Sequence, residues 1–395
     1  MRLYLITLNP TDSVTAGFLP AAAALGWDVT ILTDQPDRYP GHEAVETDVR
    51  DPGAVIDAIC GHHRPDVVFS NSDHLQAATA LAAAFFGLPG KAWRSCLSAK
   101  NKALTRRALA ALDPVRSVRL PPGAGLPAAL PYPVVVKPAM GVASEDVTLA
   151  RDAAELADAV AAIRRRRPRD LLVAEEFLDG PLYTLETLGD GSGTRVLGGF
   201  RTTLGPLPHF VEERLDWHPS PPPEHVSHVM AALGALGAGF GACHTEFAVT
   251  RDGPRVVEVN YRLIGDNCDF LLAELTGVPL FERILRVHAG EPLGDVCGEP
   301  PAGHGAAVSV VADRSGVVTA APPEVSPESP GAWAEAWTGG GVRLWHRPLR
   351  KVGDRIERTH TNRDYLGVIR ATGPDRLSVD AAVHAFRKLH PWVIA

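Results

Sequence analysis

Two neighbouring segments carry acidic and amide side chains where a buried strand would normally be apolar. The segment RVVEVNYRLIGD, residues 255–266, sets Glu258 and Asn260 among valines, and their two-residue spacing places both on one face of a strand. The Asp252–Gly253 pair before it predicts a hairpin, which brings Glu246 of the preceding strand opposite Glu258. Two carboxylates and an amide oxygen form a ligand set that Mg²⁺ prefers, with its other positions left for water and phosphate.

Protein cations could neutralise the same carboxylates. Burying unpaired carboxylates costs several kcal/mol, so a cation must lie close to them. Arg255 and Arg262 flank Glu258 in the sequence and would satisfy it as ion pairs. The residues alone therefore leave two interpretations open, a divalent ion (Mg²⁺ or Mn²⁺) and an internal ion pair.

A lysine followed by a turn of small residues forms a second group with chemical potential. In YPVVVKPAMGVASEDVTLA, residues 132–150, a predicted strand ends at Lys137, and a turn containing Gly141 and Ser144 leads to another strand. Backbone N–H groups of such a turn and the lysine ammonium can face a phosphate together. Many hairpins hold a glycine and a lysine, so this segment alone does not establish phosphate binding.

The elements that would position these groups begin with an α/β pattern. Short apolar strands at 3–8, 28–33 and 67–70 alternate with helices, which predicts a doubly wound parallel sheet. No GxGxxG motif follows the first strand, so a dinucleotide site there is unsupported. Asp73 lies just past the third strand, where such sheets bind ligands, although a helix-capping role fits it equally well.

The middle of the chain predicts an α+β region. The Pro/Gly-rich residues 112–133 indicate a linker or an extended crossing. Residues 151–170 predict an amphipathic helix, whose arginine run is expected to be a solvated end that complements the helix dipole. Two strands, LLVAEEFL and LYTLETLGD, are joined by a hinge at residues 179–180 that can offer backbone groups to a flat heterocycle.

Composition limits the class of protein. The chain has 395 residues, 45% of them hydrophobic and 22% charged, which predicts a soluble globular protein of two or three domains. The formal net charge of −7 disfavours nonspecific nucleic-acid binding. The N-terminal residues turn polar too soon for a secretory signal or a membrane span. Five scattered cysteines without a CxxC motif indicate reduced thiols, and we expect a cytoplasmic location.

The order of these pieces resembles the ATP-grasp superfamily, and within it the carboxylate–amine ligases that include L-amino-acid ligase and biotin-carboxylase-like branches. The resemblance covers residues 1–320. It implies an N-terminal doubly wound domain, an ATP-grasp domain with a small and a large lobe, and a C-terminal lobe. The corresponding ranges are 1–95, 96–300 (small lobe about 115–180, large lobe about 181–300) and 301–395.

The resemblance also implies where the nucleotide binds. NKALTRRAL resembles the family's (D/N)KxxxR helix start, which makes Lys102 the first phosphate lysine. VVVKPAMGVASEDV resembles the next family segment, which makes Lys137 the second lysine and residues 141–146, with Ser144, a flexible flap over the triphosphate. VAEEFLDGPLYTLE resembles the adenine hinge, whose contacts, largely from backbone, would come from Glu175, Glu176, Phe177 and Leu178.

The metal and substrate residues follow in the same way. HTEFAVTRDGPRVVEVNYRLIGD resembles the family's metal-binding hairpin, so Glu246, Glu258 and Asn260 would bind Mg²⁺. Arg262 would lie beside the transferred phosphate and the reacting carboxylate. Related ligases shape their substrate site around residues 198–221, and the candidates for substrate contact in this chain are Arg201, His209, Glu212, His244, Arg262 and Asp266.

Two positions depart from the family pattern. Leu182 stands where the family often has a glutamate for the ribose hydroxyls, so ribose binding must come from elsewhere or be weaker. Glu145 and Asp146 lie in the flap and would repel phosphates if they pointed inward. Neither departure touches the lysines or the predicted metal ligands.

The implied function is an ATP-dependent, Mg²⁺-requiring ligase that joins a small carboxylate to an amine, such as an amino acid, through an acyl phosphate. ATP and the metal would be held by the residues named above, and no side-chain nucleophile is needed. Two alternatives remain, a non-catalytic ATP-binding module and a bicarbonate-using carboxylase. Family members are often dimers, so the resemblance allows a homodimer, with neither nucleic acid nor membrane as a partner.

Overall fold

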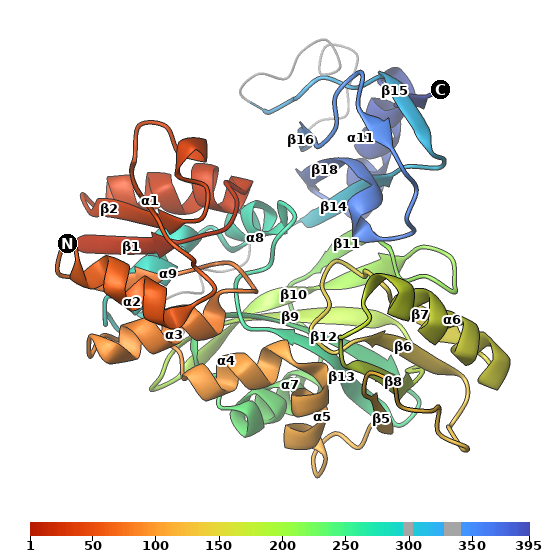
Figure 1. Ribbon diagram of the computed structural model, residues 1–395. Helices are drawn as coiled ribbons and strands as arrows, with labels where there is room; N and C mark the ends of the chain where they lie inside the picture. Colours follow the sequence, from red (N-terminus) through yellow and green to blue (C-terminus); the bar gives the residue numbers. More distant parts are fainter. Residues whose placement is uncertain (295–302, 328–340) are drawn as a thin grey trace.

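The computed structural model describes residues 1–294, 303–327 and 341–395, and it begins with a four-stranded parallel sheet of order β3-β2-β1-β4 (Figure 1). Leu3 and Leu5 pack with Phe18 on one face, whereas Tyr4 and Ile6 pack on the other, so the strand is apolar throughout. The predicted parallel α/β architecture is confirmed. Its elements are β1 (Arg2–Ile6), η1 (Ser13–Phe18, a π-helix), α1 (Leu19–Ala24), β2 (Asp28–Thr33), η2 (Pro36–Arg38), β3 (Glu43–Glu46), α2 (Pro52–Cys60), β4 (Val67–Phe69) and α3 (Gln76–Phe85).

A second four-stranded sheet, of order β5-β8-β6-β7, forms a small lobe below the C-terminal part in Figure 1. Its strands are β5 (Ser117–Leu120), β6 (Val134–Pro138), β7 (Thr148–Ala150) and β8 (Leu172–Glu176), and α4 (Trp93–Lys100) and α5 (Lys102–Leu109) precede them. Helix α6 (Ala153–Arg166) buries Leu156 and Ile163 against the sheet. The Pro/Gly-rich stretch expected to be a linker or crossing therefore contributes a strand, β5, which pairs with β8.

The largest sheet has eight antiparallel strands in the order β13-β12-β9-β10-β11-β14-β18-β16. Its first part comprises β9 (Leu182–Asp190), β10 (Thr194–Leu204), β11 (Glu212–His218), β12 (Phe240–Thr250) and β13 (Gly253–Asn260), with α7 (Pro223–Leu236), α8 (Cys268–Thr276) and α9 (Leu280–His288) around it. The hinge lies so close to β12 that a Cβ at Gly180 would be 2.1 Å from the carbonyl oxygen of Val249. Only glycine fits there without a shift of the backbone.

The C-terminal region completes the same sheet, because β14 pairs with β11 in antiparallel fashion. Its elements are β14 (His304–Val311), β15 (Gly316–Ala320), β16 (Arg343–Pro348), β17 (Arg355–Ile356), η3 (Asn362–Asp364), β18 (Tyr365–Gly373), α11 (Arg376–Leu389) and β19 (Val393–Ile394). Strands β17, β15 and β19 form a separate three-stranded sheet. Residues of this region, such as Ser309, Arg347 and Asn362, line the same cavity as residues of the N-terminal sheet and the small lobe.

Within the described ranges, no helix is long and apolar enough to cross a membrane. The four cysteines that these ranges contain, Cys60, Cys96, Cys243 and Cys268, are free thiols.

Candidate active site

A cavity of about 1120 Å³ lies between the N-terminal parallel sheet, the small lobe and the eight-stranded sheet. The loops after β1 and β4, the β6–β7 turn, the hinge, the β12–β13 hairpin and the C-terminal region all line it. Ligand pockets of roughly 300–1,000 Å³ hold drug-sized molecules, so this cavity has room for a nucleotide and a small substrate together.

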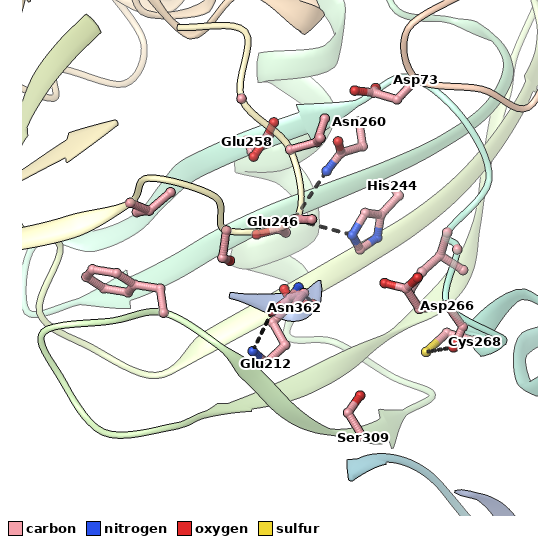
Figure 2. A pocket seen from close by; sticks show the side chains of 18 of the residues that line it. Asp73, Glu212, His244, Glu246, Glu258, Asn260, Asp266, Cys268, Ser309 and Asn362 are labelled. Carbon is pink, nitrogen blue, oxygen red and sulfur yellow. Dashed lines mark hydrogen bonds and ion pairs between the residues drawn. The ribbon is translucent and has the colours of Figure 1, made fainter. Parts of the chain in front are cut away.

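The β12–β13 hairpin brings the predicted metal ligands together. Glu246 lies directly opposite Glu258, and His244 lies opposite Asn260; a register shift between Glu246 and Phe247 sets this pairing. Figure 2 shows the two carboxylates and the amide facing the cavity. Asn260 Nδ2 donates to Glu246 Oε1 at 3.2 Å, and Lys102 Nζ lies 2.7 Å from Glu258 Oε1.

These side chains fit a divalent ion. An ammonium contacts only one oxygen of Glu258, and no guanidinium of the described ranges pairs with either carboxylate, so ion pairs do not saturate the oxygens. The described residues contain no cluster of three His, Cys, Asp or Glu side chains that could hold a metal alone. A divalent ion here would be bound by the two carboxylates and the amide oxygen of Asn260. Phosphate oxygens and water would complete its coordination, as is usual for Mg²⁺.

The two predicted phosphate lysines approach the cavity from different elements. Asn101 caps α5, since its Oδ1 accepts hydrogen bonds from the backbone N–H groups of Ala103 and Leu104, and this cap sets the direction of Lys102. Lys102 Nζ also donates to the carbonyl oxygen of Gly141 at 3.1 Å, which ties the lysine to the base of the flap.

The second lysine belongs to a buried ion-pair network. Lys137 Nζ lies 2.8 Å from Glu175 Oε2, and Arg106 donates to both oxygens of Glu175 through Nε and Nη2, at 2.8 and 3.1 Å. Burial opposes ionisation of Glu175, but the attraction of Lys137 and Arg106 outweighs it and lowers the pKa of the carboxyl far below its usual range. Both oxygens of the Glu175 carboxylate are therefore paired with protein cations.

The hinge offers an apolar slot. Phe177 and Leu178 line the cavity together with Val135, Leu182, Leu204, Leu207, Phe210 and Ala248. The backbone N–H groups of Glu176 and Phe177 already donate to the carbonyls of Arg116 and Pro133. A hydrogen bond from a backbone N–H to a bound heterocycle would thus fall to Leu178, with the apolar walls covering the ring.

A buried histidine carries positive charge beside the carboxylate pair. His244 Nδ1 lies 2.7 Å from Glu186 Oε1, and His244 Nε2 lies 3.5 Å from Glu246 Oε1. Burial disfavours the charged imidazole, yet Glu186 and Glu246 together raise the pKa of His244 to about 10. The imidazolium in turn lowers the pKa of Glu246, although burial opposes this. Glu246 is therefore held in its ionised form.

Other acidic groups, Asp73, Glu212 and Asp266, also line the cavity (Figure 2). Burial and then the neighbouring Glu246 raise the pKa of Glu212 to about 8. Asp266 adopts a left-handed backbone conformation with a φ of 55° beside Arg262, which also faces the cavity. Asp73, past β4, pairs with Lys100, and despite burial the charges of Arg262 and Lys100 lower the pKa of Asp73.

The structure brings most of the predicted site residues to this one cavity. Its lining includes Lys102, Lys137, Ser144, Glu175, Glu176, Phe177, Leu178, Glu212, His244, Glu246, Glu258, Asn260, Arg262 and Asp266. Two predicted substrate contacts lie elsewhere. Arg201 is exposed on β10, and the ring of His209 stacks on that of His360, 4.4 Å away.

The flap carboxylates face cations. Asp146 pairs with Arg166 and Arg167 at the end of α6, and Glu145 pairs with Arg167 and Arg363. The arginine run is therefore more than a solvated helix end. Although burial opposes ionisation of Asp146, the hydrogen bonds from the two α6 arginines lower its pKa. Arginines therefore offset the charge of both flap carboxylates.

Three residues of the site were not predicted from the sequence. Arg106 stands in the same KxxxR motif as Lys102, so a signal for it was present. Glu186 sits in the buried middle of β9, two residues after Thr184, whose hydroxyl donates to it at 2.8 Å. Its contact with His244 follows from the pairing of β9 with β12, which no local pattern reveals. Asn362 comes from the C-terminal region, and no local pattern marks it.

Comparison with known proteins places this geometry in context. Residues 130–270 match the family model described as an ATP-grasp domain. The chain is 30% identical over its whole length to an uncharacterized protein, y4rH, of Sinorhizobium fredii, and covers 84% of it. It is also 28% identical to the phosphoribosylamine–glycine ligase of Phenylobacterium zucineum. That match covers 79% of this chain and 69% of the ligase. Its fold matches an L-amino acid ligase from Bacillus licheniformis with a TM-score of 0.81 and 24% identity, over 100% of this chain and 98% of the other.

Proposed function

The chain belongs to the ATP-grasp superfamily of ligases, and on that basis we propose that it joins the carboxyl group of a small acid to an amine at the expense of ATP. One observation carries the proposal. A single cavity collects the two lysines, the carboxylate pair with its amide, the apolar hinge and Arg262. This is the set of groups needed to hold a nucleotide, its phosphates and a reacting carboxylate together.

The reaction proceeds in two displacements. A carboxylate oxygen of the acid attacks the γ-phosphorus of ATP, the bond to ADP breaks, and an acyl phosphate forms. The amine nitrogen then attacks the acyl carbon, the bond to phosphate breaks, and an amide, inorganic phosphate and a proton are released. The chain's task is to orient the reactants and neutralise charge, because phosphoryl transfer needs little covalent help from protein.

Each group has a defined part in this scheme. Lys102 and Arg262 face the space beside Glu258, where they would offset the charge that moves from nucleotide to acid. Glu246, Glu258 and Asn260 would hold Mg²⁺, which supplies further charge neutralisation on the phosphates. Phe177 and the apolar walls would exclude water from the base.

The acidic groups in the part of the cavity that we assign to the substrates favour an amino acid as one of the two, because an ammonium there would stabilise the ionised form of Glu212, which burial and Glu246 disfavour. Glu212 and Asp266 both face the cavity, and within the described ranges the Glu212 carboxyl is hydrogen-bonded by the neutral amide of Asn362, at 3.4 Å from its Oε2. An ammonium group would satisfy such carboxyls as a charge-assisted hydrogen bond. The fold's likeness to an L-amino acid ligase is consistent with this chemistry.

A coupled assay tests the proposal. We expect ADP and phosphate to be released in equal amounts from Mg·ATP when an acid and an amine from an amino-acid panel are supplied together. The variant Glu258→Ala should reduce this rate by about two orders of magnitude. Asp252→Ala, at the exposed turn of the same hairpin, should retain it.

Three other outcomes would contradict the proposal. Mg·ATP that raises the melting temperature but is never consumed with any acid–amine pair would indicate a binding module. ADP release stimulated by bicarbonate alone would indicate a carboxylase. A rate that survives in Glu258→Ala would remove the carboxylate pair from the mechanism.

A further inference from the structure

A loop of the C-terminal region reaches the active site and contacts two of its parts at once. Residues 359–364, here called the latch loop, lie between β17 and β18 and include η3. One side of the loop meets the flap, residues 141–146, and the other side meets the start of β11 at Glu212. The two contact regions belong to different sheets, so the loop is a bridge between them.

The flap side of the bridge uses both backbone and charge. The backbone N–H of Asn362 donates to the carbonyl oxygen of Ala143 at 3.1 Å. The guanidinium of Arg363 pairs with the Glu145 carboxylate, which Arg167 holds from the other side at 2.8 Å. The flap therefore lies between a helix end of the small lobe and the latch loop.

The same asparagine holds Glu212 on its other side. Asn362 Oδ1 accepts from the backbone N–H of Glu212 at 3.1 Å, and Asn362 Nδ2 donates to Glu212 Oε2 at 3.4 Å. Tyr365 adds a hydrogen bond to the Glu212 carbonyl oxygen at 2.7 Å. Figure 2 shows Asn362 and Glu212 side by side at the base of the site. One residue thus contacts the flap through its backbone and the substrate end through its side chain.

The loop is rigid enough to transmit a displacement. The Asp364 carboxylate accepts hydrogen bonds from the N–H and hydroxyl of Thr359 and from the N–H of His360. The imidazole of His360 stacks on His209, which fixes the loop against the segment that precedes β11. Such internal bonding lets the loop move as a unit.

The flap needs outside contacts to keep its conformation. Ala143, Ser144 and Asp146 all have positive φ, at 56°, 54° and 59°. Side chains other than glycine adopt this region rarely, and each such residue costs of order 1 kcal/mol or more. The contacts with Asn362, Arg363 and the α6 arginines offset that cost.

We propose that the latch loop holds the flap closed over the nucleotide and, through Asn362, sets the position of Glu212, so that nucleotide enclosure and substrate positioning depend on each other. Asn362 and Arg363 are positioning residues in this scheme, since neither transfers a group. The inference rests on the proposed function for the identity of what the flap covers. The physical link itself needs no turnover and is tested without it.

Hydrogen exchange of the full-length chain, without nucleotide, measures the link. The variant Arg363→Glu sets like charge opposite Glu145, and we expect backbone amides of the flap to exchange about three- to thirtyfold faster. The Arg363 side chain is 63% exposed, so this variant keeps the fold. Arg355→Glu, an exposed arginine of β17, is the matched control and should leave flap exchange unchanged.

The second arm approaches the link from the substrate side. Glu212→Ala removes one anchor of Asn362 and should speed flap exchange about two- to fivefold. Glu212→Gln keeps an acceptor for Asn362 Nδ2 and should restore the wild-type rate. Glu213→Ala, at the next residue of β11, whose carboxylate lies beside Gly205, is the control. Rescue by glutamine separates positioning from a general loss of packing.

The outcomes are distinct. Unchanged flap exchange in either Arg363→Glu or Glu212→Ala overturns the inference, and so does acceleration in β1 equal to that in the flap, since that is global destabilisation. Mg·ADP added to the wild type should protect the flap further. Failure of that protection would count against the nucleotide site of the proposed function, whereas the variant series alone decides the link.

Discussion

Replacing Glu175 by glutamine removes the central charge of the buried network with Lys137 and Arg106. The carboxyl is 3% exposed and receives three hydrogen-bonded contacts from the two cations, at 2.8 to 3.1 Å. Glutamine has the same shape, but it would turn an N–H group towards one cation and leave both positive charges uncompensated. Breaking a buried pair in this way costs about 3–5 kcal/mol of the free energy of unfolding.

The neighbouring residue provides the control. Glu176 pairs with Arg116 at 2.9 Å, but that arginine is 72% exposed, and exposed pairs contribute about 0–1 kcal/mol. Glu176→Gln should therefore lower the free energy of unfolding by less than about 1 kcal/mol. Urea-induced unfolding followed by circular dichroism gives both values, since the midpoint reports stability when the slope is unchanged.

The pH dependence follows from the same contacts. Burial disfavours the charged carboxylate, but the two cations dominate and lower the pKa of Glu175 below its ordinary value of 4.5. The stabilisation is thus fully present above pH 4.5 and is lost as pH falls below it. The difference between wild type and Glu175→Gln should shrink over that acidic range. A Glu175→Gln effect no larger than that of Glu176→Gln at pH 7 would refute the reasoning.

Three further predictions concern the nucleotide, the hinge and the charged histidine. Lys102→Met should weaken binding of a non-hydrolysable Mg·ATP analogue about tenfold or more in calorimetry, because a charge-assisted contact is lost. Gly180→Ala should lower the free energy of unfolding by about 1–3 kcal/mol, since its Cβ would clash with the Val249 carbonyl, whereas Gly193→Ala has open space and should not. Burial opposes the charge of His244, yet its carboxylate partners raise its pKa from 6.5 to about 10, so the stability lost in His244→Gln should be largest below pH 6.5 and should diminish towards pH 10 in melting curves.

Local patterns were sufficient to predict the main elements of the fold. The apolar runs at β1, β2 and β4 lie in a sheet covered on both faces, where every position of a strand is apolar, so the prediction of a parallel sheet was confirmed. The Asp252–Gly253 pair indicated the β12–β13 hairpin, but the pairing of Glu246 with Glu258 also depends on a register shift between Glu246 and Phe247, which no local pattern marks. Strand β5 was not predicted, because the prolines and glycines around it mask a four-residue strand whose stability comes from pairing with β8.

Site residues that belong to a sequence motif could be predicted. Site residues that are brought in only by strand pairing far along the chain could not. Lys102 and Glu258 are 156 residues apart, yet both belong to recognisable segments. Glu186 lies in the buried middle of β9, and its hydrogen-bond partner His244 comes from the neighbouring strand β12, far away in the sequence. Asn362 lies 150 residues beyond Glu212, and only the extension of the eight-stranded sheet through β14 and β18 brings them together.

The acidic pair of the flap, a departure from the family pattern, and the arginine run, expected to be a solvated helix end, explain each other in the structure. An acidic pair in a phosphate-covering flap is unfavourable on its own, and a run of arginines at a helix end has no assigned partner on its own. In the fold, Asp146 and Glu145 meet Arg166 and Arg167, so each set neutralises the other without help from the nucleotide. A basic flap would gain its stability only from bound phosphate and would be open without it. In this chain the arginine contacts and the contacts that hold the positive φ angles of the turn come from the protein, so we expect the flap to be ordered before a nucleotide binds. Compared with a basic flap, this flap attracts phosphate less strongly, but it is preorganised, so less conformational entropy is lost when a ligand binds.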